Sequence, residues 1–433
     1  MKPKIIKLKN GARLIYIHDA RNNYSAVEAG FIAGHASNPA NGVAHFMEHM
    51  LFKGTKTKNA EQFNEAKEAI VPSLNAYTSK NLMMVTFTRT NALFDKAMEL
   101  VGEMLTANKL DKKEIENEKG VIKEEYRMRV DRSSRDLSFV HTGTLSQSQL
   151  TDEQILGSPD DIDAINLKLL DNFKNSNYFA QNFIAAYCGN LCELRVKNAF
   201  NKYFVSRLKS RPDYQAKVID IKVDKTPDLT VRTNTEQLIK MRLSFVMNVP
   251  YLEGKRRYEN RCIAEFLNKN KSSLFNTLRN KGLVYTVNAT SRYMFDTKLL
   301  NITLTTGKDK LSRCLNEVAR EINAIAGGKI TAADLDTIKA NLKYKAEEEV
   351  RGAKSEMYDA ALDEYVNEGK GSIYTITKHQ RLKAMKQITL DEVNAYAKKL
   401  FNKNNPPYVT IMGKAKKSEL PTYAQILDTL YKK

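Results

Sequence analysis

The sequence predicts an α+β protein built from two homologous domains, and three observations support this expectation. The chain has 433 residues, which is too long for one ordinary hydrophobic core. Segments with the hydrophobic period of a strand alternate with segments with the period of a helix. The order of these segments then recurs, so that residues 83–105 match residues 299–322 in pattern at an offset of about 215 residues.

The first half begins with a predicted hairpin. Residues 8–19, LKNGARLIYIHD, place two apolar runs about an Asn-Gly turn, and residues 24–34 predict a further strand. Helical spacing follows over 42–52 and 60–70, then a strand pattern over 75–90 and a helix over 92–107. Residues 111–136 predict a long charged helix with apolar positions at Ile115, Val121 and Ile122.

The second half repeats this order of elements. Residues 229–250 and 285–306 have the pattern of strands, and residues 258–280 and 308–327 have that of helices. A polar segment with two prolines separates the halves. We therefore expect an N-terminal domain over 1–210, a linker over 211–227 and a C-terminal domain over 228–433.

Composition narrows the class of protein. With 42% hydrophobic and 27% charged residues, the chain resembles a globular protein. No apolar run approaches the roughly 18–20 residues that span a membrane, and the start lacks a secretory h-region, so we expect a cytoplasmic protein. The four cysteines are too scattered for a disulfide framework and predict reduced thiols.

The formal charge of +19 favours neutral or acidic partners over basic ones. The lysines are spread along the whole chain, and no nucleic-acid-binding motif accompanies them. A solvated basic surface explains this charge better than a nucleic-acid-binding protein, which would bind in a strongly salt-dependent way. We expect no nucleic-acid partner.

One motif carries chemistry. In AHFMEHMLFKGT, His45 and His49 are four residues apart, so a helix places both imidazoles on one face. Glu48 lies beside them, where its carboxylate can reach a bound water. Two imidazoles, a carboxylate base and an open position are the parts of a hydrolytic zinc site. The alternative is a pair of capped or exposed histidines on a surface helix.

A catalytic zinc needs a third protein ligand. The charged helix after residue 111 offers Glu114, Glu116, Glu118, Glu124 and Glu125. Glu118 and Glu125 are seven residues apart and share a helix face, whereas Glu124 points about 100° away. Taken alone, each of these glutamates is equally well explained as part of a solvated helix face.

The motif resembles the inverted zinc motif H-x-x-E-H of the pitrilysin and insulinase metallopeptidases. The chain is most similar to the short branch that includes mitochondrial processing peptidase and its bacterial relatives, and F-K-G-T strengthens the likeness. The resemblance covers nearly the whole chain. It implies two mostly antiparallel sheets packed with helices, which together form half of a clamshell chamber.

The resemblance also assigns roles by position. In ENEKGVIKEE it implies Glu125 as the third zinc ligand and Glu118 as an acid that orients the site. NAYTS is similar to the family's N-A-x-T strand, which implies that Asn75, Ala76, Tyr77 and Thr78 bind an extended substrate. LRNKGLVYTV resembles the segment with a substrate-binding arginine and tyrosine, here Arg279 and Tyr285. Ser73-Leu74 stands where the family has Gly-Gly.

These assignments imply a zinc endopeptidase with a single Zn²⁺ per chain. Glu48 would act as the base, Tyr285 would stabilise the oxyanion, and Arg279 would hold the peptide. Because one chain carries both the zinc motif and the Arg/Tyr segment, we expect a homodimer with sites completed in trans. A heterodimer with a related chain is the other possibility. A non-catalytic subunit of a peptidase-like complex is the alternative function.

Overall fold

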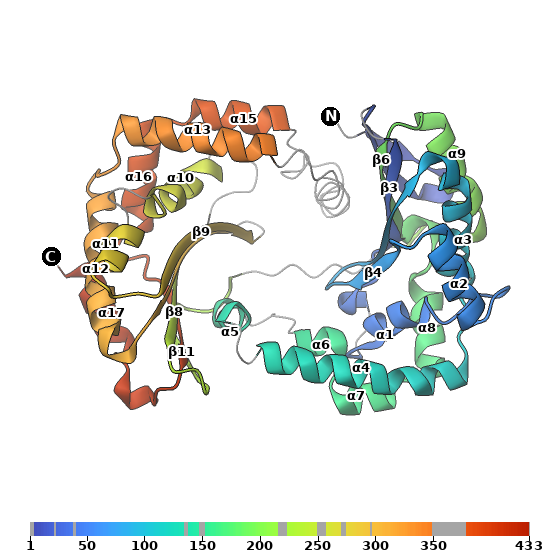
Figure 1. The fold of residues 1–433 in the computed structure, drawn as a ribbon, viewed down its shortest axis with the longest axis horizontal. Helices are drawn as coiled ribbons and strands as arrows, with labels where there is room; N and C mark the ends of the chain where they lie inside the picture. The colour runs from blue at the N-terminus through green and yellow to red at the C-terminus, as the bar shows by residue number, and fades with distance from the viewer. Residues whose placement is uncertain are drawn as a thin grey trace. The chain divides into compact units, whose positions relative to one another are not determined.

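The chain folds into two compact units in the computed structural model (Figure 1). The structure describes residues 4–20, 23–37, 40–133, 137–146, 152–214, 223–248, 257–269, 274–294, 297–348 and 378–432. Of these residues, the first unit contains those of Met1–Val130 and Leu150–Ile219. The second contains those of Asp131–Gln149, Asp220–Val350 and Lys378–Lys433.

A six-stranded sheet forms the first unit, in the order β1-β2-β6-β3-β5-β4. Every neighbouring pair is antiparallel except β2 and β6, so the expected mostly antiparallel sheet is confirmed. The strands are β1 Lys4–Lys7, β2 Arg13–His18, β3 Tyr24–Phe31, β4 Asn75–Thr78, β5 Met83–Thr90 and β6 Phe183–Gly189.

The first predicted hairpin is present, and the strand expected over 75–90 is a hairpin as well. Asn10 and Gly11 turn β1 into β2 with φ values of 55° and 82°, a conformation that asparagine and glycine adopt most readily. β4 and β5 are joined by a turn in which the Ser79 N–H donates to the Leu82 carbonyl at 2.8 Å. The alternating pattern hid this turn because both strands contribute to the same core.

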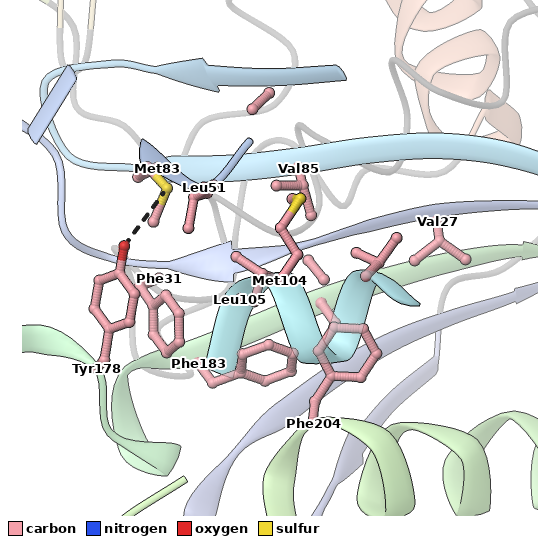
Figure 2. Packing of buried hydrophobic residues seen from close by; sticks show 14 of the residues in the cluster. Val27, Phe31, Leu51, Met83, Val85, Met104, Leu105, Tyr178, Phe183 and Phe204 are labelled. Carbon is pink, nitrogen blue, oxygen red and sulfur yellow. Dashed lines mark hydrogen bonds between the residues drawn. The ribbon is translucent and has the colours of Figure 1, made fainter. Parts of the chain in front are cut away.

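Helices cover one face of this sheet. α3 (Phe94–Ala107) packs on β5, and α9 (Glu193–Tyr203) packs on α3 and β2. Figure 2 shows part of the core between α3 and the sheet, where Met104 and Leu105 of α3 lie near Val85 of β5. α2 (Ala60–Ile70) and α8 (Leu167–Asn177) complete the helical layer (Figure 1).

The long charged helix is α4, Lys112–Ser133; residues 134–136 of the expected helix lie outside the described residues. Ile115 and Ile122 are buried in the core of the first unit, as expected. Val121, the third apolar position of this helix, is 53% exposed. It is turned by about 100° from Ile122 and therefore lies away from the core.

The second unit repeats the plan with a five-stranded sheet in the order β7-β11-β8-β10-β9. Its strands are β7 Leu229–Thr233, β8 Ile239–Asn248, β9 Thr286–Met294, β10 Thr297–Thr306 and β11 Tyr408–Gly413. Its helices include α10 Arg257–Leu267, α11 Leu274–Asn280, α12 Leu311–Ala326, α13 Ala332–Glu348, α15 Lys378–Gln387, α16 Leu390–Leu400 and α17 Tyr423–Tyr431. β9–β10 followed by α12 repeats β4–β5 followed by α3, which confirms the predicted repeat.

One helix crosses the expected domain division. α5 (Leu137–Leu145) lies within residues 1–210 but packs on β11, β8 and β7 of the second sheet. Buried His141 makes this attachment, with Nδ1 2.7 Å from Thr410 Oγ1 and Nε2 2.6 Å from Ser244 Oγ. The compact units therefore do not follow the expected boundary here. Of the expected linker over 211–227, residues 215–222 lie outside the described residues.

Two further expectations concern the thiols and the membrane. All four cysteines are free thiols, and Cys192 alone among them is exposed. Within the described ranges, no helix combines the length and the apolar character needed to cross a bilayer.

Candidate metal centre

The histidines lie on α1 (Val43–Met50), a short helix that begins at a glycine. Gly42 has φ 73°, and a Cβ on it would lie 2.7 Å from the Leu156 carbonyl oxygen. This close approach requires glycine and seats the helix start against residues 155–162. The Asn41 amide also donates to the Asp161 carboxylate at 3.2 Å, so this segment holds the start of α1 in place.

His45, His49 and Glu125 lie close together; spacing predicted this for the two histidines, and the family resemblance implied it for Glu125. His45 Nε2 lies 3.6 Å and His49 Nε2 lies 3.4 Å from Glu125 Oε2. The two imidazole centroids are 4.6 Å apart. Within the part of the chain that the structure describes, this is the one group of three histidine, cysteine or acidic residues able to hold a metal ion.

These donors fit zinc. Tetrahedral zinc with ligands at about 2.0–2.1 Å separates neighbouring donor atoms by roughly 3.3–3.4 Å, close to both measured separations. The donor set of two imidazoles and one carboxylate also occurs in hydrolytic zinc sites and leaves a fourth position open. His49 shows a further feature of a ligand, because its Nδ1 lies 2.8 Å from Glu118 Oε1, which fixes the ring.

Charges around the site favour a cation. Burial and the neighbouring His49 lower the pKa of His45 to about 4, so His45 is neutral and able to bind a metal. Burial opposes protonation of His49, but hydrogen bonds to Glu118 and Glu125 raise its pKa to about 9. The carboxylates therefore draw a positive charge to the imidazole pair, and a divalent cation can take the place of that proton.

The edge strand β4 holds the Glu48 carboxylate in place. The Thr78 hydroxyl donates to Glu48 Oε2 at 2.6 Å. Burial raises the pKa of Glu48, while this hydrogen bond acts in the opposite direction. Glu48 is thus a fixed carboxylate next to the imidazoles with a raised proton affinity, as a general base requires.

The NAYTS segment is β4, the edge strand next to β5. Ala76 points into the core, Asn75 is exposed, and Tyr77 packs on the opposite face of the sheet. An edge strand has one set of backbone groups available for an added strand. The hydroxyl of Ser73, which stands in place of a glycine, donates to the Thr88 carbonyl on β5 at 2.8 Å and accepts from the Thr88 N–H at 2.9 Å.

Arg279 and Tyr285 belong to the second unit and are not part of the cluster in the first. Arg279 lies in the last turn of α11 and is exposed, with its guanidinium 5.6 Å from the Phe275 ring centroid. Tyr285 precedes β9, its side chain is 73% exposed, and its N–H donates to the Thr305 carbonyl at 2.8 Å. Both side chains are therefore accessible to a ligand.

Sequence reasoning missed two partners of the site. Lys53, the lysine of F-K-G-T, forms an ion pair with Glu118. It lies four residues after His49, so the spacing H-x-x-x-H-x-x-x-K was a usable signal. Thr78 was predicted only as a substrate contact, and its hydroxyl also donates to Glu48 Oε2. No local pattern reveals that contact, because the two residues are 30 positions apart.

Two family models match the chain. The family described as insulinase (peptidase family M16) matches residues 13–155, and the one described as peptidase M16 inactive domain matches residues 164–342. The chain is 24% identical over 408 residues to an uncharacterized zinc protease, YmxG, of Bacillus subtilis, which covers 92% of this chain and 95% of that one. It is 27% identical over 252 residues to the mitochondrial-processing peptidase subunit beta of Neurospora crassa, covering 54% and 52%.

Solved structures share the fold. The first half of the periplasmic protease PqqL from Escherichia coli superposes with a TM-score of 0.81 at 18% identity, covering 99% of this chain and 96% of that one. A protease from Helicobacter pylori gives a TM-score of 0.75 at 19% identity, covering 95% and 99%. Together the two family matches cover more than half of the chain. The chain belongs to peptidase family M16, the insulinase family.

Proposed function

We propose that the protein is a zinc-dependent endopeptidase that hydrolyses unfolded peptides or processes a peptide precursor. The observation that carries the proposal is the cluster of His45, His49 and Glu125 with Glu48 beside it. The names of relatives as zinc proteases support the same reading. His45, His49 and Glu125 would hold the zinc ion, a single ion per chain.

When bound, zinc would supply a Lewis acid that polarises the scissile carbonyl and makes water a nucleophile near neutral pH. Glu48 accepts the proton of the attacking water and passes it to the leaving amine. Thr78 keeps the Glu48 carboxylate in one orientation. An extended substrate peptide pairs with β4 as an added strand, and this pairing presents the peptide backbone to the site.

The second unit would supply Arg279 and Tyr285, the first to hold the peptide and the second to stabilise the oxyanion. We propose that two chains close into a chamber, with the site of one chain completed by these residues of the other. This chain covers 50% of the full-length PqqL chain, so that protein has about the length of two such chains. A homodimer is the simplest version, and a heterodimer with a related chain is the other.

The substrate class follows from charge. With 69 basic and 50 acidic residues, the protein would attract acidic or neutral unfolded peptides more strongly than basic ones. A chamber would exclude folded proteins. We place the enzyme in the cytoplasm, although one structural neighbour is a periplasmic protease.

Cleavage of a quenched peptide library by the purified protein tests the proposal. We expect cleavage that a chelator abolishes and added zinc restores, with acidic peptides preferred at low salt. If the protein binds zinc but cleaves no peptide of the library, that result would instead favour a non-catalytic subunit of a peptidase-like complex. Cleavage that persists in chelator would contradict zinc catalysis.

Mixing two inactive variants tests completion in trans. One chain carries Arg279→Ala and the other Glu48→Gln, so a mixed dimer has one intact site if the residues come from different chains. Random 1:1 exchange makes half of the dimers mixed, and each mixed dimer has one intact site of two, so we expect recovered activity approaching about a quarter of that of the wild type. No recovery, with mixed dimers shown to form, would contradict the shared site.

A further inference from the structure

Lys53 continues the line of the two histidines toward α4. After Met50 the helix goes on as turns, with the Phe52 N–H donating to the His49 carbonyl at 3.1 Å and the Lys53 N–H to the Met50 carbonyl at 3.3 Å. Lys53 therefore stays on the side of His45 and His49, one further step of four residues along. Its ammonium reaches Glu118 on α4.

Glu118 is shared between Lys53 and the metal site. One carboxylate oxygen, Oε1, lies 2.8 Å from His49 Nδ1, and the other, Oε2, pairs with the Lys53 ammonium. The Glu118 side chain is 5% exposed, whereas Lys53 is 27% exposed. A carboxylate buried to this degree is stable when both oxygens have charged or hydrogen-bonding partners.

This arrangement fixes two parts of the metal site. With Oε2 anchored by Lys53, the Glu118 carboxylate has one orientation, and Oε1 in turn fixes the plane of the His49 ring. The ion pair also ties the end of α1 to α4. Glu125 follows Glu118 by seven residues on the same face of α4, so the tie sets the distance between Glu125 and the imidazoles.

We propose that Lys53 is a positioning residue for the metal, acting through Glu118 on His49 and through α4 on Glu125. This inference rests on the proposed zinc function and deepens it. Lys53 does not touch the metal or the substrate. Its effect is on the affinity for zinc, which can be measured without turnover.

The same loop offers a matched control. Lys58 lies five residues after Lys53 and pairs with Glu103 Oε2 at 2.8 Å. Lys58 is 31% exposed, close to the exposure of Lys53. Glu103 also accepts from the Thr55 hydroxyl at 2.5 Å and contacts neither histidine. The two ion pairs thus share their loop and exposure, and only one of them reaches the metal site.

The experiment measures the zinc dissociation constant of purified full-length chain by competition with a chromophoric chelator. We compare wild type with Lys53→Met, Lys53→Arg and Lys58→Met, each checked for folding by circular dichroism. We expect Lys53→Met to weaken zinc binding by about tenfold, the low end of the loss seen when orienting partners of ligands are removed. Lys53→Arg keeps the ion pair, so its zinc dissociation constant should stay within about threefold of that of the wild type.

Lys58→Met lowers the melting temperature of the metal-free chain but leaves the zinc dissociation constant unchanged. Equal weakening by Lys53→Met and Lys58→Met, or no weakening by either, would overturn the inference. If Lys53→Met does not fold, Lys53→Gln and Glu118→Gln test the same tie, and unchanged affinity in both overturns it. A wild type that binds no zinc would instead reject the proposed function itself.

Discussion

The two units share one order of strands and helices, and they differ in the contact between two helices: α1 with α4 in the first unit, and α10 with α13 in the second. In the first unit, α1 packs on the β4–β5 hairpin and meets α4 through His45, His49 and Glu125. In the second, α10 packs on β9 and β10 and meets α13, where Lys345 Nζ pairs with Glu265 Oε1 at 2.7 Å. One helix pair is joined by a candidate metal site and the other by an ordinary ion pair.

The positions of the motif explain the difference. At an offset of about 215 residues, the H-x-x-E-H positions fall on Asn260, Ile263 and Ala264 of α10. Ile263 and Ala264 belong to the core of the second unit. Asn260 is buried, and its amide donates to the Leu299 carbonyl at 3.0 Å. The second unit uses these positions for packing, whereas in the first they are the candidate ligands His45 and His49 and the proposed base Glu48, so only the first should respond to a metal.

The largest expected effect is the loss of turnover in Glu48→Gln. Removing the base should lower kcat by about 10²–10⁴-fold while zinc binding stays intact, because the amide keeps the shape of the carboxyl. The control is Glu265→Gln on α10, which should leave kcat within about twofold because that residue lies outside the site. Steady-state cleavage and zinc content measure both. Near-normal turnover in Glu48→Gln would show that the base is another group.

Metal removal should change amide hydrogen exchange in one helix pair and not in the other. A ligand at 100 times its dissociation constant stabilises the state that binds it by about 2.7 kcal/mol. Chelation should therefore speed amide hydrogen exchange in α1 and α4, where the ligands lie, and leave α10 and α13 unchanged. Hydrogen exchange with mass spectrometry measures each segment. An equal increase in both pairs would mean that zinc does not act through the first unit.

Acid should destabilise the second unit through His141. Burial and Arg242 lower the pKa of His141 to about 3 in the folded chain, against about 6.5 in an unfolded one. The folded state excludes this proton, so the stabilisation is complete above pH 6.5 and is lost as the pH falls toward 3. The loss is about 2 kcal/mol at pH 5.

His141→Gln keeps polar contacts with Thr410 and Ser244 but cannot take up this proton. Its free energy of unfolding from denaturant titration should fall less than that of the wild type between pH 7 and pH 5. Parallel curves for the two proteins would rule out His141 as the source of the acid sensitivity.

The smaller of the two expected effects on kcat is that of Thr78→Val. Loss of one hydrogen bond to a charged group is worth about 1.5–3 kcal/mol, so kcat should fall by about 10- to 150-fold as Glu48 loses its fixed orientation. Thr86→Val, on the neighbouring strand β5, removes a hydroxyl without touching Glu48 and should leave kcat unchanged. If both variants lose activity equally, the effect comes from the sheet and not from the base.

Local spacing accounts for what could be predicted from sequence. His45 and His49 are neighbours on one helix, so their spacing alone brings them together, and the repeat of strands and helices predicted the two-unit fold. Glu125 needed the family resemblance, because the spacing on α4 left several glutamates as candidates. Its contact with the imidazoles depends on how α4 packs on α1, which a single sequence does not show.

The features that could not be predicted from sequence depend on contacts between segments that are distant along the chain. Thr78 meets Glu48 only because the β4–β5 hairpin lies against α1. The segment around His141 has no strong pattern, and its attachment to the second sheet depends on buried polar pairs with residues more than 100 positions away. Lys53 was within reach of sequence reasoning, since its spacing continues that of the histidines.

Zinc content per chain is the most direct test of the central claim that the first unit alone holds the catalytic metal. The measurement is elemental analysis of wild type and of His49→Ala, both purified without exposure to chelator. The account predicts about one zinc per wild-type chain and almost none in the variant. Absence of zinc from the wild type, or equal zinc in both proteins, would contradict it.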